Sequence, residues 1–253
     1  MPRFFISKDA VSGDIITITG ADAHHIARSL RMAVDDRVTV CDMDKIEYQC
    51  ILRRITDTEV EAEILSSYAS ETEPWFLATV YQALPKGDKL DSIIQKAVEC
   101  GVYAIVPFES DRCVVRVKPE AEEKKTERRC KIAAEAAKQS GRGILPEVKE
   151  TVSFRKMLES AGEADVKLFC YEGEGTMPLG RVLPVDTMKK MNEEGRTPTV
   201  SIVIGSEGGF SLAEVEAAKQ AGLTPIGLGK RILRTETAAS FVLSALVYAL
   251  ELS

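Results

Sequence analysis

The chain has 253 residues, of which 45% are hydrophobic and 28% are charged, and its formal net charge at pH 7 is -6. That length can form one large domain or a small domain followed by a medium one, and the composition is typical of a soluble globular protein. The acidic balance excludes a strongly basic surface over the whole chain, so contacts with a polyanion must come from local patches.

Targeting signals and metal-binding spacings are missing from the sequence. The N-terminal stretch MPRFFISKDA lacks the apolar core of a signal peptide, and no apolar run approaches the roughly 18 residues that span a bilayer. The 6 cysteines form no C-x-x-C pair, and the only histidines are the neighbours His24 and His25. We therefore expect a cytoplasmic protein with no membrane anchor, no disulfide framework and no metal site.

Residues 1–72 are predicted to form a small β domain, which is also where the acidic excess lies. Four stretches with β propensity, DIITITG, RVTVCD, YQCILRRI and EVEAEIL, are separated by Gly and Asp turns at the spacing of a small barrel or sandwich. One helix is predicted between them, from Ala23 to Met32, with Asp22 as its N-cap. The polar stretch SYASETEP indicates a linker that ends at Pro74.

From residue 73 onwards the pattern changes to alternating strands and helices. Strands are predicted at FLATVYQAL, VYAIVPF, VKLFCY, TVSIVIG and TPIGLG. This alternation predicts an α/β domain with a mostly parallel sheet, whose ligands bind at the carboxyl ends of the strands. The predicted helices are DKLDSIIQKAVECG, closed by Gly101; Lys118 to Ser140, with Pro119 at its first position; SLAEVEAAKQAG, with a capping box of Ser211 and Glu214; and Thr235 to Leu252.

Two glycine-rich stretches follow predicted strands, VIGSEGGF at 203–210 and GLGKRILRTETA at 227–238. Glycines at such points permit a positive φ and let a ligand approach the backbone. An ordinary tight turn would explain either stretch alone, whereas the two together favour a ligand site. The G-x-G-x-x-G, P-loop and nucleophile-elbow fingerprints all fail on spacing, so the ligand is expected to be neither a dinucleotide nor a triphosphate.

Six motifs in a fixed order cover nearly the whole chain: HHIARSLRM, LPKGDKLDSIIQKAVECGV, DRCVVR, AAEAAKQSGR, VIGSEGGF and LGKRILRTETA. Together they closely resemble the RsmE-type ribosomal RNA methyltransferases of the SPOUT class. The resemblance implies a PUA-like β-barrel over residues 1–72 and a trefoil-knotted, mostly parallel methyltransferase domain over residues 73–253. It also implies S-adenosylmethionine as methyl donor, a homodimer, and methylation of N3 of one uridine in 16S ribosomal RNA.

The resemblance also implies which residues surround the donor. One departure is Ser206, which stands where the family usually has proline, and its freer φ is expected to leave the loop slightly looser. For Tyr171, a core aromatic at the end of a strand is an equally good interpretation. The expected donor-binding residues are Tyr171, Glu172, Ile204, Gly205, Glu207, Gly208, Leu228, Gly229, Ile232 and Leu233.

Three residues are expected to be catalytic. Methyl transfer requires the acceptor nitrogen to be aligned with the methyl group and the N3 proton to be removed. The planar guanidinium of Arg234 suits holding the target base or stabilising its developing anion. Glu236 is expected to orient Arg234 or to accept the proton, although a first-turn acid favoured by the helix dipole is an alternative. Arg142, beside a predicted glycine cap at Gly141, is expected to contact a phosphate or the base.

Cations in both parts of the chain are candidates for RNA contacts, which position a substrate without reading its sequence. In the N-terminal segment the alternative is simple surface decoration of the predicted helix. The cationic run from Lys124 to Lys131 is interpreted as a solvated helix face. The predicted RNA-binding residues are His24, Arg28, Arg31, Lys86, Arg142 and Arg231.

Two other function classes remain open at this point. One is a non-catalytic RNA-binding or ribosome-assembly factor on the same scaffold, which bound methyl donor would distinguish from the enzyme. The other is a small-molecule α/β enzyme, which would leave the N-terminal domain and its arginines without a role.

Overall fold

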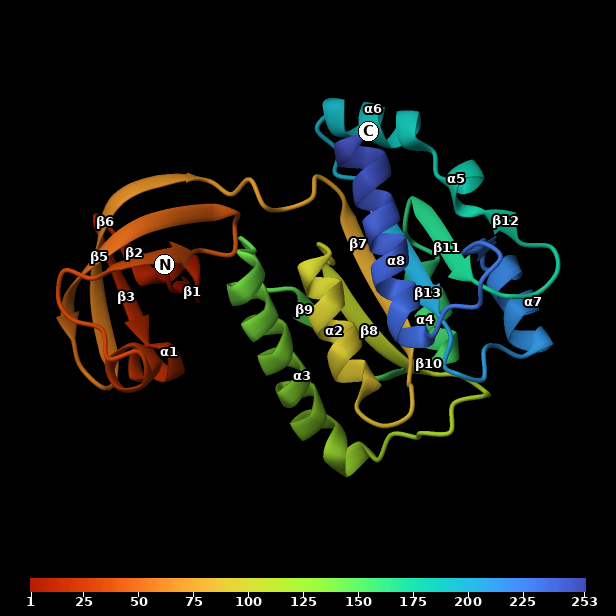
Figure 1. Ribbon diagram of the computed structural model, residues 1–253, viewed down its shortest axis with the longest axis horizontal. Coiled ribbons are helices and arrows are strands. Elements are labelled where there is room, and N and C mark those ends of the chain that lie inside the picture. Colours follow the sequence, from red (N-terminus) through yellow and green to blue (C-terminus); the bar gives the residue numbers. More distant parts are fainter. The chain divides into compact units, whose positions relative to one another are not determined.

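The computed structural model describes all residues from 1 to 253 and divides into two compact units (Figure 1). The first unit contains Met1–Glu73 together with Ala137–Leu145, and the second contains Pro74–Ala136 together with Pro146–Ser253. The segment Ala137–Leu145 could not be assigned from its sequence position, because it folds with residues that lie far from it in the chain.

A curled, six-stranded sheet forms most of the first unit, with strand order β1-β4-β5-β6-β3-β2 (Figure 1). All neighbours pair antiparallel except β1 and β4. Register shifts in the β5–β6 pair, between Gln49 and Cys50 and between Leu52 and Arg54, bend these two long strands around the core. The strands are β1 Arg3–Phe5, β2 Val11–Ser12, β3 Ile15–Thr19, β4 Arg37–Cys41, β5 Ile46–Ile55 and β6 Glu59–Ala69.

The predicted helix of this unit begins earlier than expected. It comprises α1, Gly20–His24, and a wider π turn, η2, at His25–Ser29. Thr19 stands at its N-cap position, so the prediction of Asp22 as N-cap was wrong. The Asp22 carboxylate instead accepts a hydrogen bond from Lys138 Nζ over 2.8 Å. Ile26 is fully buried, whereas Leu30, four positions further on, is 41% exposed and follows the π turn.

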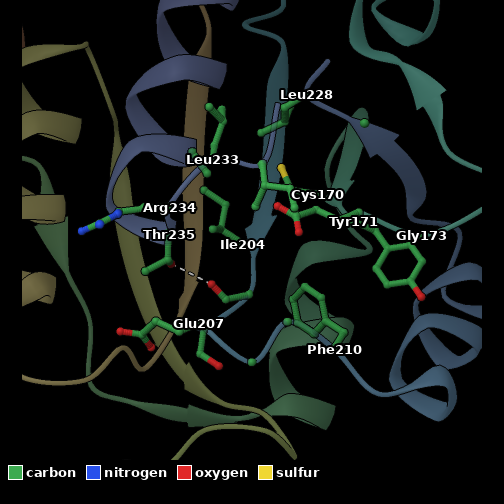
Figure 2. Close-up of a pocket in the computed structure, with 18 of the residues that line it drawn as sticks. Cys170, Tyr171, Gly173, Ile204, Glu207, Phe210, Leu228, Leu233, Arg234 and Thr235 are labelled. Atoms are coloured by element: carbon green, nitrogen blue, oxygen red, sulfur yellow. Dashed lines mark hydrogen bonds between the residues drawn. The ribbon is translucent and has the colours of Figure 1, made fainter. Parts of the chain in front are cut away.

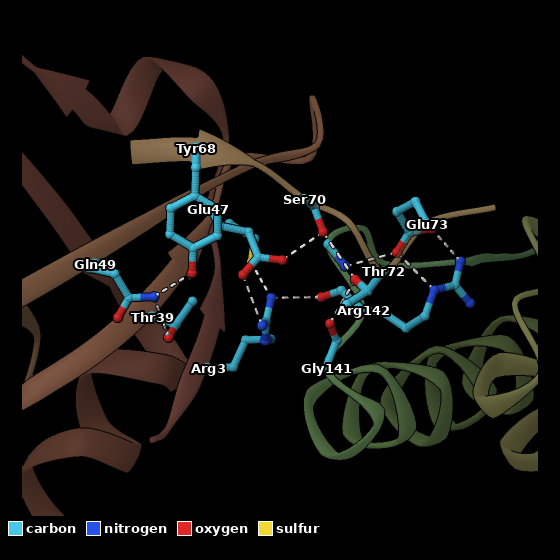
Figure 3. Close-up of polar contacts among 12 residues, drawn as sticks. Arg3, Thr39, Glu47, Gln49, Tyr68, Ser70, Thr72, Glu73, Gly141 and Arg142 are labelled. Atoms are coloured by element: carbon cyan, nitrogen blue, oxygen red, sulfur yellow. Dashed lines mark hydrogen bonds and ion pairs between the residues drawn. The ribbon is translucent and has the colours of Figure 1, made fainter. Parts of the chain in front are cut away.

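A buried ion pair fastens the segment Ala137–Leu145 to the rest of the first unit (Figure 3). Arg142 Nε and Nη2 donate to the two Glu73 oxygens over 2.8 and 2.7 Å, and each side chain is only 3% exposed. The Glu73 carboxylate also accepts the backbone N–H of Gly143 over 2.8 Å. The Arg142 carbonyl in turn accepts a hydrogen bond from Arg3 Nη1 over 3.1 Å. The side chain of Arg142, its backbone carbonyl and the next backbone N–H are therefore all hydrogen-bonded within this unit.

The second unit is built on a parallel sheet with strand order β10-β8-β7-β13-β11-β14-β12, and β9 pairs with β8. The five longer strands are the five that the apolar runs predicted, whereas the two-residue strands β9, β10 and β12 are too short to leave a sequence signal. The strands are β7 Leu77–Ala83, β8 Ala104–Glu109, β9 Glu147–Val148, β10 Val152–Ser153, β11 Val166–Cys170, β12 Met177–Pro178, β13 Thr199–Ile204 and β14 Thr224–Gly227.

The four predicted helices of this domain are confirmed: α2 Lys89–Glu99, α3 Pro119–Ser140, α7 Leu212–Gln220, and α8 Thr235–Val247 continued by η3 Tyr248–Leu252. The capping box of Ser211 and Glu214 is formed as predicted. Three helices were not predicted, α4 Phe154–Ala161, α5 Leu179–Val182 and α6 Val185–Glu193, of which α5 is a single turn. The predicted fold class is confirmed: a curled antiparallel sheet unit and a mostly parallel sheet unit. The trefoil knot stays a prediction, because strand order alone does not define a knot.

The C-terminal helix Thr235–Leu252 is long and apolar enough to cross a membrane by length and composition alone, with 39% of it buried. The sequence interpretation missed this. Its buried residues, among them Ala239, Val242 and Leu246, pack in the second unit, where α8 contacts α2 and β13. One face of the helix is therefore part of the domain core.

We expect the Arg142→Met variant to lose about 3–5 kcal/mol of unfolding free energy, because the Glu73 carboxylate would remain buried without its cation. Equilibrium chemical denaturation of the full chain measures this loss. The matched control is Arg37→Met, since the Arg37 side chain is exposed and makes no ion pair. Equal denaturation midpoints for the two variants would contradict the structural role assigned to Arg142.

Candidate functional site

A cavity of ≈ 710 Å³ opens at the carboxyl ends of β11, β13 and β14. Three segments supply most of its lining: residues 170–173 after β11, 204–210 after β13, and 227–236 after β14. These loops meet because the carboxyl ends of neighbouring parallel strands lie along one edge of the sheet. The volume falls in the usual range of about 300–1,000 Å³ for small-molecule sites.

All ten residues predicted to bind the donor line this cavity. Ile204 is buried at the inner end, and Leu228 and Leu233 add apolar surface above it (Figure 2). The Tyr171 ring lies against the backbone of Gly173 at one side. Ile232 is 82% exposed, so it lies at the rim instead of forming an inner wall. The structure brings the predicted set together, and the role of each member in donor binding stays a prediction.

Phe210 anchors the loop that follows β13. Its ring lies 4.3 Å from that of Phe169 and stacks nearly parallel to Phe108 at 6.4 Å, between centroids. The residue is only 3% exposed. Because an aromatic cluster fixes one end of the loop and β13 fixes the other, residues 205–209 form a short, preorganised bridge across the floor of the cavity.

Glu207 ties this loop to the segment between β7 and α2. Its carboxylate accepts the backbone N–H of Lys86 over 3.1 Å and pairs with Lys89 Nζ over 2.7 Å. Burial opposes ionisation of this group, but the hydrogen bonds from Lys89 and from backbone amides outweigh it and lower the pKa of Glu207. The carboxylate is therefore fully charged at neutral pH, and the loop is held in a fixed place.

A second tie joins β7, β13 and the start of α8. The Thr235 hydroxyl donates to the Gly205 carbonyl over 2.7 Å, and Gln82 Nε2 donates to the Thr235 hydroxyl over 2.9 Å (Figure 2). Gln82 is fully buried and Thr235 is 7% exposed. This network fixes the helix start beside the loop after β13, and so sets where Arg234 and Glu236 leave the backbone.

Arg234 and Glu236 stand at the cavity mouth in different environments. The Arg234 side chain is 83% exposed and extends away from Tyr171 (Figure 2). The Glu236 side chain is 20% exposed and lies 3.9 Å from both Arg234 Nη1 and Lys89 Nζ. Its Oε2 atom is buried with no hydrogen-bond partner. This oxygen therefore has no hydrogen-bond donor although the carboxylate lies near two cations.

The structure differs from the prediction at Arg142. This residue was expected to touch a phosphate or the base, but its guanidinium is buried against Glu73 and does not line the cavity. An arginine that is 3% exposed and bidentate to a carboxylate has no surface to offer to RNA. The motif AAEAAKQSGR, which ends at Arg142, therefore has a structural role in the first unit.

The remaining predicted RNA-binding residues lie in two places. His24, Arg28 and Arg31 are exposed in the first unit, where Arg28 pairs with Asp57. Arg231 lines the cavity, and Lys86 is exposed on the loop that Glu207 contacts. On α3 the cationic run is exposed as predicted, with one exception: Arg129 is 7% exposed and is paired with Glu122 over 2.9 Å.

Sequence reasoning missed several residues that build the site. Only Gln82 had a signal in the sequence: it is the one amide side chain in the largely apolar strand β7, and a buried amide requires hydrogen-bond partners. Lys89 and Arg112 also line the cavity, and neither side chain was assigned a role from the sequence. Their contacts with residues 207 and 208 join segments about a hundred positions apart in sequence.

Comparison with known proteins gives matches over both units. Residues 72–247 match the model of an RNA methyltransferase domain, and residues 18–65 match that of an RNA methyltransferase PUA domain. The ribosomal RNA small subunit methyltransferase E of Bacillus subtilis (strain 168) is 35% identical over 255 residues, covering 100% of this chain and 98% of the relative. That of Aquifex aeolicus (strain VF5) is 33% identical, covering 93% and 95% of the two chains.

Among solved structures, the Neisseria gonorrhoeae ribosomal RNA small subunit methyltransferase E was determined bound to S-adenosyl methionine. It superposes with a TM-score of 0.84 at 29% identity, covering 99% of this chain and 98% of the other. The similarity therefore extends through both units.

We expect the Lys89→Met variant to raise the pKa of Glu207 toward its ordinary value of 4.5, because a hydrogen bond and a nearby positive charge are removed. The folded-state pKa lies below the unfolded value, so the tether stabilises the protein at neutral pH and is lost as pH falls through the folded pKa. In the variant this loss begins at a higher pH.

Carboxyl-carbon NMR titration of Glu207 measures the change directly. Lys96→Met, at the other end of α2, is the matched control, because Lys96 is exposed and makes no ion pair. It should leave the pKa of Glu207 where it is. The same titration curve in Lys89→Met and wild type would show that the ion pair does not hold the loop.

Proposed function

We infer the function from a family relationship: this chain belongs to the RNA methyltransferases, specifically to the ribosomal RNA small subunit methyltransferase E type. We propose that it methylates N3 of one uridine in 16S ribosomal RNA with S-adenosylmethionine as donor, acting on small-subunit RNA or particles in the cytoplasm. The observation that carries this is the single cavity in which all ten expected donor residues meet.

The residues of the cavity fit S-adenosylmethionine in size and chemistry. Ile204, Leu228 and Leu233 offer an apolar surface suited to adenine, and the loops around them expose backbone amides and carbonyls. Tyr171 and Glu172, at the end of β11, would meet the ribose or the methionine portion. When bound, the donor supplies a methyl group on a positively charged sulfur, which needs no metal or covalent enzyme intermediate.

The chain's own residues must align the base and manage one proton. Arg234 is exposed at the mouth, so its guanidinium can reach a base that enters from solvent and can stabilise negative charge on the uracil oxygens. The Glu236 side chain is 20% exposed and lies 3.9 Å from Arg234 Nη1, so it can accept the N3 proton or orient Arg234. The tie between Thr235 and Gly205 holds both residues beside the donor loop.

We also propose a homodimer whose interface includes α8 and η3. Phe241, Tyr248 and Leu252 are 40%, 65% and 72% exposed and follow one another at helical spacing, which forms an apolar stripe on the outer face. Since the opposite face already packs in the core, this stripe exceeds what the monomer buries. A symmetric pairing of two such stripes is the usual way to cover them.

Two variants should separate donor binding from catalysis. Arg234→Lys keeps the charge but loses the planar fork, so we expect single-turnover methylation to fall about tenfold to a hundredfold, as for one lost charge-assisted hydrogen bond, with donor affinity unchanged. Gly229 has a φ of 101°, so Gly229→Ala strains the loop and should lower the affinity for the donor.

Single-turnover assays on small-subunit particles and calorimetry with S-adenosylmethionine measure the two effects. Wild-type turnover in Arg234→Lys would remove Arg234 from the chemistry. Donor binding without any methylation by the wild type would favour a non-catalytic RNA-binding or assembly factor.

Tyr248→Glu should weaken the dimer, because it places a charge in the apolar stripe. Sedimentation velocity at micromolar concentration measures the change in mass, and Leu212→Glu is the control, since Leu212 is 77% exposed on a different helix. The proposal fails if the wild type is an active monomer under the same conditions.

A further inference from the structure

Arg112 belongs to the motif DRCVVR, for which the proposed function provides no role. The loop that carries it follows β8 and is fixed at both neighbours. The Asp111 N–H donates to Glu214 over 2.8 Å, and the Asp111 carboxylate accepts from the Ser211 hydroxyl over 2.8 Å. Cys113 is buried, with its sulfur 3.4 Å from the Ser110 backbone nitrogen. The backbone on both sides of Arg112 is therefore held in place.

The Arg112 side chain lies along the loop after β13 and lines the cavity. Its Nη1 donates to the Gly208 carbonyl over 3.1 Å. The approach is so close that a Cβ added at Gly208 would lie 3.0 Å from Arg112 Cβ and 3.1 Å from its carbonyl oxygen. Glycine at 208 thus permits the contact, and a single hydrogen bond to an uncharged carbonyl leaves most of the guanidinium donors open.

Most other cations near Arg112 are neutralised by carboxylates. Lys89 pairs with Glu207 over 2.7 Å, and Arg116 lies 3.7 Å from Glu109. Arg112 has no carboxylate within 4.0 Å, and the same holds for two other cavity-lining cations, Lys230 and Arg231. Exposed, uncompensated cations are the groups that attract a polyanion.

The three uncompensated cations lie at the two flanks of the cavity. Arg112 follows β8 but lies against Gly208 in the loop after β13, whereas Lys230 and Arg231 follow β14. Arg234 and Glu236 line the same cavity. A strand of RNA that bridges Arg112 and Lys230 would lie at the cavity that the expected donor residues also line.

We propose that Arg112 binds a backbone phosphate of the RNA substrate, and that the strand runs from Arg112 to Lys230 and Arg231 with the target base presented between them. This inference rests on the proposed function and names a positioning residue for it. Phosphate is favoured over the carboxylate of the donor, because Arg112 is exposed and rises from the β8 loop, outside the three loops that supply most of the lining.

The test compares Arg112→Gln, Arg112→Lys and Arg116→Gln in the full chain, with isolated 16S ribosomal RNA as the probe. Binding is measured over a range of salt concentrations, beside calorimetry with S-adenosylmethionine and a denaturation midpoint for each variant. Arg112→Gln should flatten the log–log salt slope of RNA binding by about one and leave donor affinity unchanged.

Arg112→Lys should keep the slope, because a phosphate contact mainly requires the charge. Arg116→Gln should match the wild type, because the Arg116 charge is already compensated by Glu109. An unchanged slope in a folded Arg112→Gln variant would overturn the proposal, and so would a loss of donor affinity in its place, which would assign Arg112 to the donor carboxylate. Failure of the proposed function would be visible separately, as wild-type protein that neither binds the donor nor methylates RNA.

Discussion

The hydrogen bond from the Thr235 hydroxyl to the Gly205 carbonyl, 2.7 Å long, joins the two halves of the site. On one side is the loop after β13, which forms the floor of the cavity. On the other is the first turn of α8, which carries the two residues proposed for chemistry. Gln82 completes the joint from β7, and a fully buried amide is positioned more rigidly than a surface contact could be. The relative position of donor and acceptor groups follows from this joint.

Ion pairs neutralise most arginines of the first unit but not all of the cations at the cavity. In the first unit most arginines face carboxylates: Arg28 with Asp57, Arg53 with Asp35 and Glu63, and Arg54 with Glu59 and Glu61. Exposed pairs of this kind add little stability, but they cancel the field that would attract RNA. At the cavity, by contrast, Arg112 and the loop after β14 keep their charge. A net charge of -6 is therefore compatible with RNA binding at one edge.

The sequence allowed the longer strands, the four main helices and the donor loops to be predicted, because each leaves a local signal. Apolar runs mark the buried strands, and glycines mark the loops where φ is positive. The residues of the site that were misassigned or missed depend on partners far along the chain. Arg142 is buried because Glu73, 69 positions away, reaches it, and Arg112 is held by Gly208, 96 positions away. Local patterns carry no information about such pairings until the fold brings them together.

Arg142 and Arg112 show why a motif locates a residue more reliably than it assigns a role. Both arginines stand in motifs that resemble the family, and charge alone suggested RNA contact for the first and nothing for the second. Burial decides otherwise. A guanidinium that is 3% exposed between two carboxylate oxygens can only stabilise the first unit, whereas one bound to a single carbonyl keeps donors for a phosphate. An arginine that is already paired with a carboxylate stabilises the fold, whereas one without such a partner can bind a phosphate.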